Sequence, residues 1–278
     1  MKQYSRPEML QRLRDKLARG RIIVGAGAGT GISAKFAEEG GADLLLVFNS
    51  GRYRMDGLGS LSGLMAYGDA NAIALEMGER HVLPIVKEVP VICSVNGTDP
   101  TRVMKYFLKK VIEAGFSGVN NFPTVGLIDG NFRAALEQTG MGFYKEVEMI
   151  GLAHDMDIFT MAYVFCAEEA RQMARVGCDV LIAHVGLTSG GSIGAMQTVS
   201  LAEAAAIIRE IREAALEVNP DIILLCHGGP ISSPEDVREI LRLVPVQGFV
   251  GASSIERLPV ENGIRDAVAA FAAIPLQT

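Results

Sequence analysis

Short apolar runs alternate with amphipathic segments along most of the chain. Eight runs have the length and composition of buried strands, at residues 21–24, 44–48, 91–95, 118–122, 158–164, 180–184, 222–226 and 248–251. Segments with the periodicity of helices lie between them, at residues 32–39, 66–79, 101–114, 141–154, 167–176, 200–218, 234–243 and 261–272. The runs are apolar on both faces, as in parallel strands that are covered by helices. Eight strand–helix units in series predict a (βα)₈ TIM barrel of the α/β class.

The start of the chain predicts an additional helix. Residues 5–8, Ser-Arg-Pro-Glu, form a capping box, and Gly20 is a typical helix stop, so a helix is expected over residues 6–19. No linker or shift of composition interrupts the units that follow. We therefore expect one domain over residues 1–278, with residues 1–20 packed on a barrel that residues 21–278 form.

The lengths of the connections indicate where chemistry takes place. Residues 49–65, 120–140 and 185–199 are the longest connections, and each follows a predicted strand. In a barrel all such loops gather at the C-terminal end of the strands, where active sites lie. Residues 188–194 are small and glycine-rich, so they could close over that end as a lid or form an uninvolved surface loop.

Composition excludes several classes of protein. Apolar residues make up 49% of the chain and the net charge is −6, which favours a packed core and argues against a nucleic-acid surface. No apolar run approaches the roughly 18 residues that a membrane helix requires. The four cysteines are scattered without a C-x-x-C pair, which indicates a reducing cytoplasm rather than a disulfide framework or a zinc site.

A run of alternate glycines follows the first predicted strand, in the sequence VGAGAGTGIS of residues 24–33. A dinucleotide-binding turn needs G-x-G-x-x-G, but the sixth position is Thr30 when counted from Gly25 and Ile32 when counted from Gly27. No acidic residue ends the second predicted strand, and no Lys-Ser or Lys-Thr pair completes a Walker motif. The glycines are interpreted as room for this loop to pass close to other loops or to a ligand.

The strongest signal for an anion site follows the seventh and eighth predicted strands. Barrel enzymes commonly bind phosphate between these two loops, where backbone amides converge. Both loops are glycine-rich here, and two serines can donate from their hydroxyls. Tight turns without a ligand are the alternative. The residues expected to hold the anion are Gly228, Gly229, Gly251, Ala252, Ser253 and Ser254.

Three titratable residues are candidates for catalysis. His184 and His227 end predicted strands, which would aim both imidazoles at the barrel mouth for proton transfer. Asp99 is the carboxylate nearest to a strand end, so it could act as a base or as a ligand of Mg²⁺, a cation that the sequence allows but does not demand. The alternatives are core histidines and a helix-capping aspartate.

Polar residues after the second and fourth predicted strands complete the expected site. Arg52 and Arg54 could clamp a carboxylate or phosphate, with Arg52 also stabilising charge during the reaction. The alternative is that they are solvated or paired with nearby acids. Gly25, Gly27, Asn49, Ser50 and Asn121 are the remaining residues expected to contact the substrate.

Long motifs then resemble a known family. The stretches GRIIVGAGAGTGISAKFAEEGGADLLLVFNSGRYRMDG, NGTDP, NFPTVGLIDGNFRAALEQTGMG, HVGLTSGGSIGA, LCHGGPISSPEDV and GFVGASSIERLP resemble the phosphoenolpyruvate hydrolase-like TIM-barrel family, also described as phosphonopyruvate hydrolases or TIM-barrel signal-transduction proteins. The resemblance runs from about Gly20 to about Pro259. It implies a hydrolase or lyase that releases phosphate from a small phosphorylated or phosphonate carboxylate. A barrel that binds such a metabolite and signals without catalysis is the alternative.

The resemblance does not carry over a metal site. Characterised phosphonopyruvate hydrolases hold Mg²⁺ with clustered aspartates that include an Asp-x-Asp pair at the barrel mouth. The only such pair here, Asp155 and Asp157, precedes a predicted strand and so belongs to the opposite end. Schiff-base chemistry is disfavoured because no predicted strand contains lysine. The alanine-rich residues 266–274 suit a homo-oligomer interface or packing on the barrel.

Overall fold

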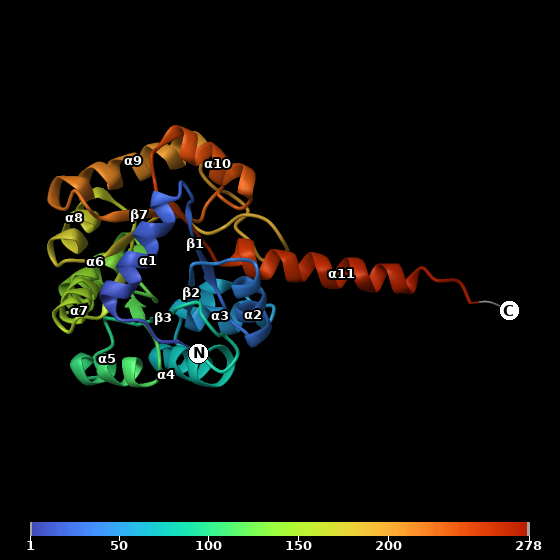
Figure 1. The fold of residues 1–278 in the computed structure, drawn as a ribbon, viewed down its shortest axis with the longest axis horizontal. Helices are drawn as coiled ribbons and strands as arrows, with labels where there is room; N and C mark the ends of the chain where they lie inside the picture. Colours follow the sequence, from blue (N-terminus) through green and yellow to red (C-terminus); the bar gives the residue numbers. More distant parts are fainter. Residues whose placement is uncertain (1, 277–278) are drawn as a thin grey trace.

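A computed structural model describes residues 2–276 and places eight parallel strands in a closed barrel, in chain order (Figure 1). The strands are β1 (Ile23–Gly27), β2 (Leu44–Val47), β3 (Val91–Ser94), β4 (Gly118–Asn120), β5 (Phe159–Val164), β6 (Val180–His184), β7 (Ile223–His227) and β8 (Gly248–Gly251). The helices are α1 (Arg6–Ala18), α2 (Gly31–Glu39), α3 (Asn49–Met55), α4 (Ala70–Met77), α5 (Met104–Glu113), α6 (Gly130–Gln138), α7 (Phe143–Asp155), α8 (Ala167–Arg175), α9 (Leu201–Val218), α10 (Pro234–Leu243) and α11 (Leu258–Ala272). The predicted barrel is confirmed.

Two layers of apolar side chains explain why the strands read as continuous apolar runs. One cluster fills the barrel, with Leu46, Ile92 and Tyr163 among its members. The other lies between the strands and the surrounding helices and includes Val47 and Cys93. Successive residues of a strand therefore point into different layers, and both layers exclude water.

The N-terminal helix α1 lies across the end of the barrel from which the strands start (Figure 1). Met9 and Leu13 are buried and belong to the same cluster as the barrel interior. Arg6 pairs with Asp179, at the start of β6, at 2.9 Å. The capping box between Ser5 and Glu8 is present as predicted, so the additional helix is confirmed.

The first strand differs from its prediction. β1 continues to Gly27, so half of the glycine run is strand rather than loop. Gly25 pairs in register with Leu44 and with Val250 on the two neighbouring strands. A Cβ atom at Gly25 would lie 3.1 Å from Cγ2 of Val250, so this glycine serves close packing inside the barrel.

Two of the three long connections contain helices. Residues 49–65 include α3 and the short helix η1 (Ser60–Leu64), and residues 120–140 include η3 (Val125–Leu127) and α6. These helices were not predicted: α3, η1 and η3 have at most seven residues, and α6 buries none of its residues. Residues 185–199 contain no helix, and an isolated bridge joins Ser189 to Ala195.

The last helix, α11, does not lie against the barrel. It begins at the barrel rim and extends outward as a free arm, drawn in red in Figure 1. None of its residues is buried. No helix in residues 2–276 is long and apolar enough to span a membrane.

Candidate active site

A small cavity opens at the C-terminal end of the barrel, with a volume of about 180 Å³. Phe48, Phe122 and Tyr163 form its apolar floor, and His184 and His227 line one wall. Its other walls come from the loops after β2, β6 and β8, so residues far apart in sequence meet there. The cavity therefore occupies the end of the barrel where the sequence places the chemistry.

The two histidines are neighbours and have opposite tautomers. His184 and His227 are paired in the register of β6 and β7, and their ring centroids are 4.6 Å apart. Nδ1 of His227 lies 2.6 Å from the carbonyl oxygen of Val250, which only accepts, so Nδ1 carries the proton. The backbone N–H of Gly186 donates to Nδ1 of His184 at 3.1 Å, so neutral His184 carries its proton on Nε2. Nε2 is thus an acceptor on His227 and a donor on His184.

Burial keeps both imidazoles neutral. It lowers the pKa of His227 to about 4, despite the hydrogen bond to Val250. It also lowers the pKa of His184 well below its usual range, and the neighbouring His227 adds to this effect. Near neutral pH the pair therefore offers one basic nitrogen and one N–H donor.

A buried ion pair joins three loops at the mouth. Nη2 and Nε of Arg54, on α3, donate to Oε2 of Glu256 at 2.7 and 3.0 Å. The other oxygen of Glu256 accepts from the backbone N–H of Gly29 at 2.6 Å. The side chains of Arg54 and Glu256 are 2% and 0% exposed. This contact fixes the loops after β1, β2 and β8 to one another and holds Arg54 at the cavity wall.

A second arginine ties residues 187–195, part of the loop after β6, to the start of α11. Arg257 donates to Glu261 at 2.7 Å and to the carbonyl oxygen of Gly190 at 3.0 Å. Glu261 also accepts from the backbone N–H of Ser192 at 3.0 Å. Thr188, Ile193 and other residues of this segment line the cavity.

The glycines of the two loops that the sequence predicts as an anion site contact other parts of the chain in the structure. The N–H of Gly229 donates to the carbonyl oxygen of Gly186 at 2.8 Å, and a Cβ atom at Gly228 would lie 2.2 Å from that oxygen. Their positive φ angles, 84° and 56°, thus serve the close approach of two loops. Gly251 packs against the side chain of Ile255.

Only part of the second loop faces the cavity. Ala252 and Ser253 line it, whereas Ser254 does not. Ser253 begins the helical segment η4 (Ser253–Arg257). Gly25 and Gly27 do not line the cavity either, since a Cβ atom at Gly27 would press on Phe48 and Ala252 at 3.1 Å.

Several other candidate residues point elsewhere. Arg52 lies on the outer side of α3 and pairs with Glu76 at 3.0 Å, because residues two apart on a helix face different sides. Asn49 donates to the carbonyl oxygen of Gly63 at 2.8 Å, and Ser50 lines the cavity. Asn121 donates to Glu146 at 2.7 Å, outside the barrel interior.

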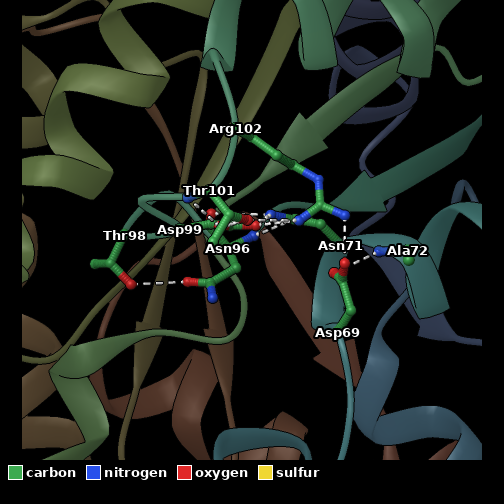
Figure 2. A network of polar contacts seen from close by, with 8 residues as sticks. All are labelled: Asp69, Asn71, Ala72, Asn96, Thr98, Asp99, Thr101 and Arg102. Atoms are coloured by element: carbon green, nitrogen blue, oxygen red, sulfur yellow. Dashed lines mark hydrogen bonds and ion pairs between the residues drawn. The ribbon is translucent and has the colours of Figure 1, made fainter.

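Asp99 is the centre of a structural network rather than a free carboxylate (Figure 2). Its oxygens accept from Asn71 Nδ2 at 2.9 Å, from the Thr101 hydroxyl at 2.6 Å and from Arg102. Arg102 also pairs with Asp69, the N-cap of α4. The network connects the loop after β3 to the start of α4, so Asp99 stabilises the packing of these two segments at the C-terminal end of the barrel.

We expect Asp99→Asn to lower the free energy of unfolding by about 1–2 kcal/mol at pH 7, because a half-buried acceptor loses its charge-assisted bonds. Burial raises the pKa of Asp99, but the bonds from Thr101, Asn71 and Arg102 outweigh it and hold the pKa at about 2. The folded state therefore binds this proton more weakly than the unfolded state, and the stabilisation is lost as pH falls from about 4 to 2. Urea unfolding at pH 7 and pH 2.5 measures this: the two proteins should differ at pH 7, and the difference should shrink at pH 2.5 and vanish only below about pH 2. An equal difference at both pH values would contradict the expectation.

The donor set at the mouth does not fit a divalent cation. Mg²⁺ binds through carboxylates and water, but the acids Asp99 and Glu256 are both committed to arginines. Among residues 2–276, no group of three or more His, Cys, Asp or Glu side chains could hold a metal ion. The bonds that Asp99 already makes to Asn71, Thr101 and Arg102 disfavour it as a metal ligand.

The sequence did not predict some of the residues that form the site. Tyr163, Phe48 and Phe122 read as strand residues of an apolar core, although their rings form the cavity floor. Glu256 and Arg257 follow the eighth predicted strand, and they pair with Arg54 and Glu261, respectively. Their positions directly after a predicted strand were the available signal.

Similarity to known proteins covers nearly the whole chain. A family model described as phosphoenolpyruvate hydrolase-like matches residues 8–274. Two curated relatives from Solanum lycopersicum, the ToMV susceptible protein tm-1(GCR26) and the ToMV resistance protein Tm-1(GCR237), are each 55% identical, over 97% and 98% of this chain. This chain spans only 36% of the length of each of them.

Solved structures share the fold at low sequence identity. The crystal structure of phosphonopyruvate hydrolase in complex with oxalate and Mg++ has a TM-score of 0.63 and 16% identity, over 96% of this chain and 92% of that chain. This likeness shows a common barrel. The match of the family model from residue 8 to residue 274 carries the assignment that the sequence motifs predict: the chain belongs to the phosphoenolpyruvate hydrolase-like family.

Proposed function

We propose that the chain is an enzyme that hydrolyses a small phosphonate or phosphorylated carboxylate, such as phosphonopyruvate or phosphoenolpyruvate, and releases phosphate. The observation that carries the proposal is the pair of neutral, buried histidines with opposite tautomers at the cavity wall. The cavity volume of about 180 Å³ is below that of pockets for drug-sized ligands, which limits the substrate to a small metabolite. The phosphonopyruvate hydrolase structure of the same fold adds support for this substrate class.

Phosphonopyruvate illustrates the proposed reaction. Nε2 of His227 accepts a proton from a water molecule while that water attacks phosphorus. The electron pair of the P–C bond moves into the carbonyl group and forms an enolate, toward which His184 Nε2–H donates a hydrogen bond. His227 then returns its proton to the carbon that carried phosphorus, which leaves pyruvate and phosphate. His184 keeps its proton throughout.

The walls of the cavity offer groups for the anionic ends of the substrate. Arg54 lies at the wall, and Ala252 and Ser253 stand at the start of the helical segment that continues into α11. The free amides and the dipole of a helix N-terminus favour anions. We propose that these groups donate hydrogen bonds to the anionic ends of the substrate in place of a divalent cation.

The test follows ³¹P spectra of phosphonopyruvate and phosphoenolpyruvate with the protein, in EDTA and in added Mg²⁺. Release of inorganic phosphate in EDTA supports the proposal, and release only with Mg²⁺ overturns its metal-free form. The relatives are longer than this chain, which favours a ligand-sensing module as the second candidate function. Thermal stabilisation by these compounds without any phosphate release would establish that second function.

We further propose that α11 is an interface between copies of the chain. Ile264, Val268 and Phe271 recur at helical spacing on the arm and are 63%, 61% and 74% exposed. Apolar side chains grouped on a protruding helix are typical of a covered surface. A second copy of the chain is always present in solution. A symmetric contact between two copies would bury the apolar side chains of both α11 helices at once.

We expect the wild-type protein to elute as a dimer or larger species, and Val268→Asp with Phe271→Asp to elute as a monomer, because two charges would be buried in the contact. Size-exclusion chromatography with light scattering measures the mass. Arg265→Glu, on the polar side of the same helix, is the control and should keep the assembly. A monomeric wild-type protein would overturn the proposal.

A further inference from the structure

Two neutral polar side chains lie inside the barrel without a hydrogen-bond partner. Both polar atoms of the Asn120 side chain, at the end of β4, and the hydroxyl of Ser94, at the end of β3, are buried and make no hydrogen bond with residues 2–276. Asn120 is 0% exposed and Ser94 is 1% exposed. Nearly all buried polar groups in proteins are paired, because an unpaired one lowers stability. An apolar residue would fill either position at less cost, which points to a role other than packing.

These two side chains are neighbours that point toward the barrel axis. Ser94 and Asn120 are partners in the parallel register of β3 and β4. Ile92, two residues before Ser94, belongs to the interior cluster, whereas Cys93 belongs to the outer one. Asn121 contacts Glu146 outside the barrel, so Asn120 faces inward.

The floor of the active-site cavity separates this pair from the histidines. Phe48 and Phe122 line the cavity, and their ring centroids are 5.3 Å apart. Phe122 lies two residues beyond Asn120, on the same side of the chain. Phe48 follows Val47, which pairs with Cys93, and therefore lies beside Ser94. Access from the cavity to the two polar side chains requires that one of these rings turns.

The chemistry of the pair selects an uncharged oxygen. Asparagine offers two N–H donors and a carbonyl acceptor, and serine offers a hydroxyl that donates and accepts. Neither supplies a charge, so a buried carboxylate or phosphonate would lack compensation there. A ketone or hydroxyl oxygen, in contrast, can use the donors of both side chains.

We propose that Ser94 and Asn120 form a neutral subsite, which binds the ketone or hydroxyl oxygen of the substrate together with Nε2–H of His184, while the wall that carries Arg54 takes its anionic ends. This inference rests on the proposed function and specifies its substrate class as 2-oxo or 2-hydroxy carboxylates. In the proposed hydrolysis the same oxygen gains negative charge as the P–C bond breaks. Side-chain amide and hydroxyl donors stabilise such a charge, and here they would do so without a metal.

The first test concerns stability. Asn120→Leu and Ser94→Ala are expected to leave the melting temperature unchanged or to raise it, because each removes an unpaired buried group. The matched control is Ser117→Ala. Ser117 is also a buried serine, but its hydroxyl accepts from the backbone N–H of Tyr4 at 3.1 Å. The melting temperature of this variant should therefore fall. If the melting temperatures of Ser94→Ala and Asn120→Leu fall as that of Ser117→Ala does, the two side chains have a structural role and the proposal is overturned.

The second test uses two probes that differ only in the oxygen, phosphonopyruvate and 3-phosphonopropionate. Binding to the wild-type protein, measured by calorimetric titration or, where phosphate is released, by the KM of phosphonopyruvate and the inhibition constant of 3-phosphonopropionate, should give a preference for phosphonopyruvate on the order of 10- to 100-fold, about 10-fold for each hydrogen bond. Asn120→Leu should reduce this preference to less than about threefold. An unchanged preference in the variant, or equal binding of both probes by the wild type, overturns the proposal.

Failure of the subsite and failure of the proposed function are distinguishable. If phosphate is released but the preference for phosphonopyruvate over 3-phosphonopropionate does not depend on Asn120, the subsite is rejected and the proposed hydrolase activity stands. If that preference depends on Asn120 but no phosphate is released, the subsite stands and the proposed hydrolase activity is rejected. If neither probe binds the wild-type protein, both are rejected.

Discussion

Replacing Glu256 by glutamine is expected to lower the free energy of unfolding by about 3–5 kcal/mol, which is the cost of leaving a buried charge without its partner. Arg54 is 2% exposed, so its guanidinium cannot turn to water when the carboxylate is removed. The change also weakens the contact with the Gly29 amide, which joins the first loop to the last one. For a chain of this length the melting temperature should fall by on the order of 10 °C.

The control is the double variant Arg54→Met with Glu256→Leu. It removes both charges and should recover most of the lost stability, because apolar residues often replace a buried ion pair without net cost. Chemical denaturation of the two single variants and the double variant closes a thermodynamic cycle. A loss below about 1 kcal/mol in Glu256→Gln would show that the ion pair does not hold the rim together. The double variant should still bind phosphonopyruvate poorly, since Arg54 lines the cavity.

The barrel could be predicted because its signal is repeated. Continuous apolar runs, each followed by an amphipathic segment, specify buried parallel strands whichever loops connect them. Capping boxes at Ser200 and Ser233 mark the starts of α9 and α10 to within a residue. By contrast, α3 has a glycine in its middle and no capping side chain, and contacts at the rim rather than its own residues hold it in place.

The candidate site was predictable in position more than in detail. Strand ends specify that His184 and His227 meet at the mouth, because the register of a barrel aligns them. Their tautomers depend on Val250 and Gly186, and sequence spacing does not reveal such contacts. Arg52 and Arg54 look equivalent in sequence, and only the orientation of α3 separates them. Glycine is equally ambiguous, since Gly228 looks the same whether its backbone approaches a ligand or another loop.

The largest expected effect on activity comes from His227→Asn. The asparagine amide can still donate to the carbonyl oxygen of Val250, as Nδ1 of the histidine does, but it has no counterpart of the basic Nε2. Loss of a general base typically lowers the rate by roughly 10²–10⁴-fold. His184→Gln should cost less, on the order of 10-fold, because the glutamine amide can donate from the position of Nε2. The surface residue His81 provides the control, and His81→Gln should leave the rate unchanged.

The pH profile distinguishes this role from a purely structural one. Since burial lowers the pKa of His227 to about 4, the folded protein keeps Nε2 unprotonated down to that value. The kcat/KM of the wild-type protein should therefore stay level from pH 7 to about 5 and fall as pH drops through 4, whereas a base with an ordinary histidine pKa would lose activity from about 6.5. In His227→Asn the rate should be lower, and the fall of kcat/KM as pH drops through 4 should disappear. If the variant keeps more than a tenth of the wild-type rate, or keeps this fall of kcat/KM, His227 is not the base, and the water must lose its proton to another group at the cavity wall.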